Sequence, residues 1–257
     1  MALALSLGRR GQGNVWPNPA VGCVIVQGAR IVGRGWTQPG GRPHAEPQAL
    51  AQAGAAARGA TVYVTLEPCS HHGKTPPCAQ ALIDAGVARV VIATQDDDAR
   101  LNGRGIAMLR AAGIEGSVGL HEDAARADNA GFFCRTDLGR PMLTLKLANS
   151  FDGRIATGTG ESQWITDAPA RRLTHAMRAR HDAVMVGAGT ARKDDPSLTV
   201  RGLGVAQQPA RVVVSRRLDL PLMGQLARTA AEVPLILCHR TDADPALVKA
   251  WSDLGAT

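Results

Sequence analysis

Short apolar runs alternate with polar turns rich in Gly and Pro along the whole chain. Residues 20–26 form a continuous apolar, β-branched run, which is typical of a buried strand, and residues 31–36 follow it after a Gly28–Ala29 turn. These two segments predict a hairpin. Further strands are predicted at residues 61–66, 89–94, 142–148, 211–214 and 233–238. Helices are predicted at residues 1–10, 44–57, 79–85, 105–112, 121–133, 171–180 and 245–254. Strands and helices that alternate in this way predict an α/β fold.

A polar turn at residues 135–141 divides this pattern. Gly139 and Pro141 close the turn before a new apolar run begins at Met142. The length of 257 residues favours one to two domains, and a hydrophobic content of 45% is ample for a buried core. We therefore predict a domain at residues 1–138 and a second domain at residues 139–257.

Composition and charge argue against some classes of binding partner. The net charge is +7, but the basic residues are scattered and aromatic residues make up only 3% of the chain, which argues against stacking on single-stranded nucleic acid. A small phosphorylated ligand explains the excess charge more simply. No apolar run approaches the ~20 residues that cross a bilayer, so no membrane partner is expected. Five cysteines without a secretory segment favour a reducing compartment, which predicts a cytoplasmic protein.

Candidate chemistry is concentrated in two short stretches, Pro43–Glu46 and Glu67–Cys78. His44, Cys69 and Cys78 offer three N and S donors, which suit a tetrahedral zinc ion whose fourth position stays open for water. Glu46 is not needed as a ligand, so it can move a proton from that water, whose pKa zinc lowers to about 7, onto a leaving amine. The order His-x-Glu, Pro-Cys and a second Cys is that of zinc deaminases.

Three other interpretations remain open at this point. The two cysteines could form a disulfide. His71 or His72 could supply a fourth ligand and close a purely structural zinc site. The protein could also be a nucleic-acid deaminase of the tRNA type, although that class has a short cysteine spacing and here eight residues separate Cys69 from Cys78.

The run from Val64 to Cys78 closely resembles the deaminase half of the bifunctional deaminase-reductase family of riboflavin biosynthesis. This resemblance implies a three-layer αβα fold like that of cytidine deaminase. It also implies zinc-dependent hydrolytic deamination of 2,5-diamino-6-(5-phosphoribosylamino)pyrimidin-4-one, a small phosphorylated pyrimidine, with no nucleic-acid partner. By the same resemblance Asn18, Lys74 and Asp96 are substrate-binding residues. At residue 98 this chain has Asp where relatives commonly have Asn.

Residues 145–156 and 160–166 resemble the start of the reductase half of the same family, whose fold is similar to dihydrofolate reductase. The resemblance implies NADPH as the second cofactor and reduction of the product's ribose to a ribityl chain. It assigns Ala148, Trp164, Thr190 and Asp194 to the cofactor, and Ser162, Arg178, Leu198 and Arg201 to the substrate. No Gly-x-Gly-x-x-Gly follows a strand in this half, so the NADPH prediction depends on the resemblance alone.

The resembling reductases continue beyond the length of this chain, which implies that residues 139–257 are an N-terminal portion of the reductase domain. We therefore expect a working deaminase with little or no reductase activity. Unpaired strand edges and exposed apolar surface in a partial domain favour self-association, so a homo-oligomer is expected.

Overall fold

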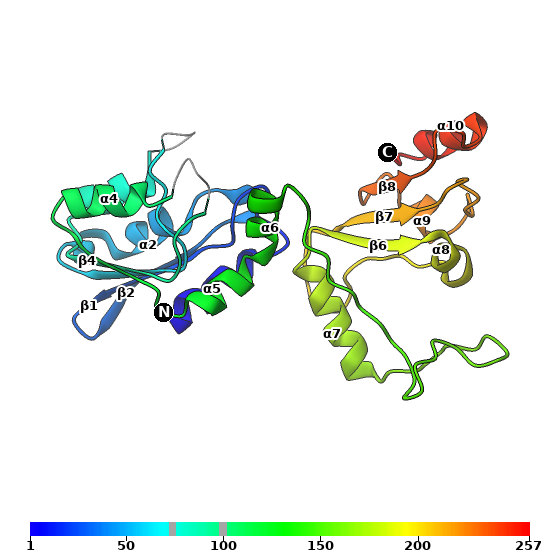
Figure 1. Cartoon of the computed structure of the whole chain (residues 1–257), viewed down its shortest axis with the longest axis horizontal. Coiled ribbons are helices and arrows are strands. Elements are labelled where there is room, and N and C mark those ends of the chain that lie inside the picture. The colour runs from blue at the N-terminus through cyan, green and yellow to red at the C-terminus, as the bar shows by residue number, and fades with distance from the viewer. Residues whose placement is uncertain (72–75, 98–101) are drawn as a thin grey trace. The chain divides into compact units, whose positions relative to one another are not determined.

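The computed structural model describes residues 1–71, 76–97 and 102–257 (Figure 1). The chain forms two compact units, Met1–Thr144 and Leu145–Thr257. The predicted boundary near residue 139 stays a prediction. Within the described residues, no helix has the length and apolar character that a membrane span requires.

The first unit is built on a five-stranded sheet. Its strands are β1 (Gly22–Gln27), β2 (Arg30–Trp36), β3 (Thr61–Val64), β4 (Arg89–Ile92) and β5 (Glu115–Val118), in the spatial order β2-β1-β3-β4-β5. β1 is antiparallel to both β2 and β3, whereas β3, β4 and β5 are parallel. The predicted hairpin is therefore present. The sequence pattern gave no signal for β5, whose residues are at most half-buried.

Helices cover both faces of this sheet (Figure 1). Helices α2 (Ala45–Ala53), α3 (Cys78–Asp84) and α4 (Arg104–Ala111) enclose the main core with β1, β3 and β4. Helices α1 (Ala2–Gly8) and α5 (Glu122–Asp128) pack on the other face, where Ala4 and Leu7 contact Val24, and Leu5 contacts Ala93 and Ala125. The three-layer αβα fold predicted for the first domain is confirmed.

Two glycines of β2 allow α2 to approach the sheet closely. A Cβ atom on Gly33 would lie 2.2 Å from the carbonyl oxygen of Ala49, and one on Gly35 would lie 2.1 Å from that of Ala45. Any side chain at these positions would push the helix away from the strand. The glycines therefore hold the first turn of α2, which carries Glu46, directly against the sheet.

The single helix predicted at residues 121–133 is wrong, because the structure has two helices there. α5 ends at Asp128 and α6 runs from Ala130 to Leu138. Asn129, between them, is buried; its Oδ1 accepts from the backbone N–H of Ala20 at 2.8 Å and its Nδ2 donates to the Ala20 carbonyl at 3.2 Å. These two bonds tie the helix break to the segment that leads into β1.

The second unit contains a parallel sheet in the order β6-β7-β8, formed by β6 (Ala183–Gly187), β7 (Ala210–Val214) and β8 (Leu235–Cys238). Its helices are α7 (Ala168–Ala179), α8 (Ala188–Asp194), α9 (Gln225–Arg228) and α10 (Pro245–Asp253). The core of this unit includes Val213, Leu235 and Trp251. This is the partial dihydrofolate-reductase-like α/β unit that was predicted.

The strand predicted at residues 142–148 is wrong. Residues 141–150 have no regular secondary structure, and the side chains of Leu143, Leu145 and Leu147 are 73%, 81% and 66% exposed. A strand needs a neighbour to pair its backbone groups, and none of the described strands pairs with this segment. The apolar pattern alone was therefore not enough to predict a strand at residues 142–148.

Candidate functional site

Three metal-binding donors from separate elements meet in the first unit. His44 is the N-cap residue of α2, Cys78 begins α3, and Cys69 follows β3 after Glu67 and Pro68. Their ligand atoms all lie within 4.8 Å of one another. The Nδ1 atom of His44 lies 3.3 Å from the Sγ atom of Cys78 and 3.8 Å from that of Cys69.

These separations fit a zinc ion. With bonds of about 2.0–2.3 Å, the donors of a tetrahedral zinc site lie about 3.3–3.8 Å apart. The cluster includes no fourth protein donor among the described residues. His71 lines the adjacent pocket but is not part of the cluster, and His72 lies outside the described residues. The arrangement is that of a catalytic zinc site.

The two thiols of the site have opposite tendencies to ionise. Hydrogen bonds from the Cys78 thiol and from His44 lower the pKa of Cys69 to about 4. The hydrogen bond to Cys69, together with burial, raises the pKa of Cys78. Cys69 is therefore a thiolate at neutral pH, the form that binds a metal. None of the five cysteines is in a disulfide, so that interpretation is wrong.

Glu46 is the buried acid of the pocket. It lies in the first turn of α2 and is 3% exposed. Burial and the nearby Cys69 thiolate raise the pKa of Glu46 to about 7. A carboxyl group with this pKa can both accept and release a proton near neutral pH. Glu46, His44 and Cys69 line one cavity of about 810 Å³.

Asn18 contacts the metal-binding histidine directly. It lies in the Pro17–Pro19 turn, its Nδ2 atom donates to the carbonyl of Gly41 at 3.0 Å, and the same atom lies 3.1 Å from Nε2 of His44. Gly41 has a φ of 81°, and a Cβ atom there would lie 2.7 Å from Cγ of Asn18. The Asn18 amide therefore lies directly against the ring of the metal-binding histidine. No local sequence pattern indicates this contact.

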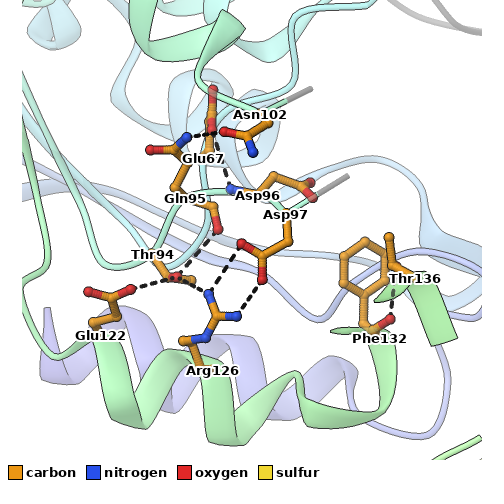
Figure 2. A network of polar contacts seen from close by, with 10 residues as sticks. All are labelled: Glu67, Thr94, Gln95, Asp96, Asp97, Asn102, Glu122, Arg126, Phe132 and Thr136. Atoms are coloured by element: carbon orange, nitrogen blue, oxygen red, sulfur yellow. Dashed lines mark hydrogen bonds and ion pairs between the residues drawn. The ribbon is translucent and has the colours of Figure 1, made fainter. Parts of the chain in front are cut away.

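The loop after β4, whose residues 94–97 are drawn in Figure 2, forms another wall of the cavity. Asp96 is 3% exposed, and both Asp96 and Asp97 line the cavity. Asp97 forms an ion pair with Arg126 of α5, whose guanidinium also donates to the hydroxyl of Thr94 at 3.3 Å. Arg126 was not predicted, because it is distant from the loop in the sequence. Lys74, predicted to bind substrate, lies outside the described residues.

In the second unit, the predicted substrate residues Arg178 and Arg201 come together. Arg178, on α7, donates to the carbonyl of Thr199 at 3.1 Å, and the backbone N–H of Arg201 donates to Nδ1 of His175 at 3.1 Å. Burial, and then the charge of Arg201, lower the pKa of Arg178. Neither arginine is in an ion pair with another described residue.

The other predicted positions of the second unit are more dispersed. Leu198 is buried with a φ of 57°, close in sequence to Arg201, while Ser162 is half-buried in an irregular segment. Thr190 and Asp194 are exposed on α8. Trp164 is 69% exposed and lies 4.4 Å from the guanidinium of Arg171, measured to the ring centroid. Ala148 lies in the irregular segment described above.

One hydrogen bond connects two segments that carry predicted cofactor residues. Nζ of Lys193, on α8, donates to the carbonyl of Gly160 at 3.0 Å. This bond ties the segment that leads to Trp164 to the helix that carries Thr190 and Asp194.

Both halves of the chain match described sequence families. The cytidine and deoxycytidylate deaminase zinc-binding region matches residues 1–94, and the RibD C-terminal domain matches residues 141–249. The chain is 46% identical over 246 residues to the riboflavin biosynthesis protein RibD of Aquifex aeolicus, a match that covers 96% of this chain and 69% of the relative. RibD of Escherichia coli is 50% identical over 222 residues, which cover 86% of this chain and 60% of that protein.

A solved structure from Thermotoga maritima gives a TM-score of 0.88 at 38% identity, covering 96% of this chain and 71% of that one. It is described as a diaminohydroxyphosphoribosylaminopyrimidine deaminase/5-amino-6-(5-phosphoribosylamino)uracil reductase. The chain spans between 60% and 71% of the length of these three relatives. The zinc-type cluster, the two matched regions and these relatives agree, and the chain belongs to the RibD family of bifunctional deaminase-reductases of riboflavin biosynthesis.

Proposed function

We propose that residues 1–138 form a zinc-dependent deaminase domain that acts on 2,5-diamino-6-(5-phosphoribosylamino)pyrimidin-4-one. One observation carries this proposal: the His44, Cys69 and Cys78 donors and the buried carboxyl group of Glu46 line or adjoin a single cavity. The Thermotoga relative, whose description names such a deaminase, supports the choice of substrate.

In this proposal the three donors would hold zinc, which would lower the pKa of a bound water to about 7. Glu46 accepts a proton from the attacking water and delivers it to the amino group that leaves. The carbon that bore the amine becomes a carbonyl, and ammonia is released. The pKa of about 7 suits Glu46 to both transfers.

Substrate recognition is assigned to the walls of the cavity. Asn18 and Asp96 line it from two different loops, and Lys74 belongs to the same proposed set. Asn18 has a second task, because its amide contacts the His44 ring. The substrate would therefore meet an amide that is already fixed in place.

We further propose that residues 139–257 are an N-terminal portion of a reductase domain that uses NADPH. The ribose carbonyl carbon of the deaminated product would accept the hydride that NADPH supplies when bound. Arg178 and Arg201 would bind the phosphate of that product, because two neighbouring guanidinium groups favour a phosphate. Ser162 and Leu198 complete the proposed substrate set, and Ala148, Trp164, Thr190 and Asp194 are assigned to NADPH.

The proposed setting is that of a cytoplasmic homo-oligomer with a small phosphorylated pyrimidine as its partner, and with no nucleic acid or membrane. The proposed function is tested by measuring ammonia release from that pyrimidine and from an oligonucleotide that contains adenosine or cytidine. Steady release from the pyrimidine alone is expected. Release from the oligonucleotide alone would establish the nucleic-acid deaminase instead.

A further inference from the structure

Glu67 connects the metal-binding segment to the loop that carries Asp96. It lies between β3 and Cys69 in the chain, and its side chain is 5% exposed. Neither zinc binding nor proton transfer uses this carboxylate. Pro68 is the single residue between Glu67 and the metal donor Cys69.

Backbone N–H groups donate to both oxygens of the Glu67 carboxylate. Oε2 accepts from the N–H groups of Asp96 at 3.3 Å and Gly103 at 3.0 Å. Oε1 accepts from the N–H groups of Gly105 at 2.9 Å and Ile106 at 3.2 Å. A carboxylate has about four acceptor sites, so these contacts saturate it. Glu67 therefore acts within the protein and leaves no acceptor for a substrate.

Two of these donors belong to the first turn of α4, where N–H groups have no partner inside the helix. A negative charge at this end of a helix is favourable. The helix also packs directly on the metal-binding segment, because a Cβ atom on Gly105 would lie 2.0 Å from the carbonyl oxygen of Pro68. Glu67 thus fixes the start of α4 against the residues that precede Cys69.

The Asp96 loop is held from two sides (Figure 2). Glu67 binds the backbone of Asp96, and Arg126 of α5 binds the side chain of Asp97. Of these two contacts, the one with Glu67 connects the loop to the segment that carries Cys69. Displacing this carboxylate would move Asp96 relative to the metal donors while leaving the donors themselves in place.

We propose that Glu67 is a positioning residue for deamination, which sets Asp96 at a fixed place in the cavity relative to Cys69 and Glu46. This inference rests on the proposed function, since it concerns how the pyrimidine is held. The negative charge is essential to the arrangement. In Glu67→Gln one oxygen remains an acceptor, but the new NH₂ group faces two N–H donors.

A double-mutant cycle tests the proposal with the diaminopyrimidine substrate. Glu67→Gln should keep its zinc and raise KM about tenfold or more, the effect of losing one charged hydrogen bond, with a smaller change in kcat. In an Asp96→Asn background the same substitution should lower kcat/KM by less than about threefold, because Glu67 acts through Asp96. Glu115→Gln is the matched control, since Glu115 is exposed on β5 in an ion pair with Arg89, and it should leave KM unchanged.

Equal losses of kcat/KM in the two backgrounds would overturn the proposal. So would an unchanged KM in a Glu67→Gln protein that is merely less stable. If the wild-type protein releases no ammonia from the pyrimidine, the proposed function fails instead, and the two failures are thereby distinguished.

A second variant covers the case in which Glu67→Gln does not fold. Gly103 has a φ of 74°, so Gly103→Ala strains one of the four donors while Glu67 stays intact. It should raise KM severalfold with unchanged zinc content. An unchanged KM in this folded variant would also contradict the proposal.

Discussion

At the residue scale, Glu46 allows chemistry to be separated from metal binding. It lies beside the Cys78 thiol but is not one of the three metal donors. Glu46→Gln keeps the shape of the side chain and removes the proton carrier. We expect ammonia release to fall about 10²–10⁴-fold, the usual contribution of a general acid-base group, with zinc content unchanged. Ammonia assays and metal analysis of the same preparation measure both.

Cys69→Ala provides the contrasting variant. It removes a donor whose thiolate the site stabilises, so metal and activity should be lost together, and stability should fall because metal binding is coupled to folding. If Glu46→Gln instead loses its zinc, the assignment of Glu46 as a proton carrier outside the ligand set is wrong.

Asn18 gives a second prediction at this scale. Its amide lies against Nε2 of His44, and partners in that position typically change metal affinity 10–100-fold. Asn18→Ala should therefore weaken zinc binding by about this factor and impair turnover, with little change in the thermal midpoint of the zinc-free protein. Chelator competition and calorimetry measure the two effects. A large fall in the midpoint with normal kinetics and normal zinc affinity would show that Asn18 serves only the fold.

The metal donors and Glu46 could be predicted because they lie in two short stretches in which residue type and spacing carry the signal. Asn18 was predicted for the substrate, but its contact with His44 spans 26 residues and depends on how two loops meet. Glu67 accepts from donors 29 to 39 residues away, which no local pattern encodes. Gly103 and Gly105 were the only hint in the sequence. In the structure Gly103 has a positive φ, and Gly105 packs on Pro68.

At the scale of elements, the break between α5 and α6 is the feature that periodicity missed. Asn129 is 5% exposed and exchanges two hydrogen bonds with the backbone of Ala20. Asn129→Ala should lower the free energy of unfolding by about 2–4 kcal/mol, because it leaves both backbone groups unpaired in a buried site. Urea denaturation measures this change.

Asn149→Ala is the control for that experiment. Asn149 is exposed, and within the described structure its side chain donates to the carbonyl of the adjacent Ser150. Its substitution should change the free energy of unfolding by less than about 0.5 kcal/mol. Equal effects of the two substitutions would show that Asn129 does not hold the helix break in place.

Most strands and helices of the first unit were predictable, since apolar β-branched runs and the Gly-rich hairpin turn act locally. Two kinds of element were not. β5 is short and at most half-buried, and therefore lacks the apolar signature of a central strand. Residues 142–148 have the apolar composition of a strand but pair with none of the described strands, so pairing rather than composition decides their structure.

At the scale of the whole molecule, the sequence indicated two domains because a polar turn separates two apolar patterns. The structure divides into compact units between Thr144 and Leu145, and each unit has its own buried core. The two predicted sites also differ in how far their residues are already held together without a ligand. The donors of the first unit converge within 4.8 Å, whereas the predicted cofactor residues of the second lie partly in a segment without helix or strand.

This difference predicts deaminase activity without efficient reduction. Residues 139–167 contain no helix or strand, and Trp164 and Phe151 within them are highly exposed. NADPH would have to order this segment as it binds, which subtracts from its affinity. We expect a Kd on the order of 0.1 mM or weaker and little NADPH oxidation with the deaminated product. Trp164 fluorescence, with Trp164→Phe as the control for the other three tryptophans, follows binding, and absorbance follows oxidation. Tight binding with sustained oxidation would instead show that this segment is already competent to hold the cofactor.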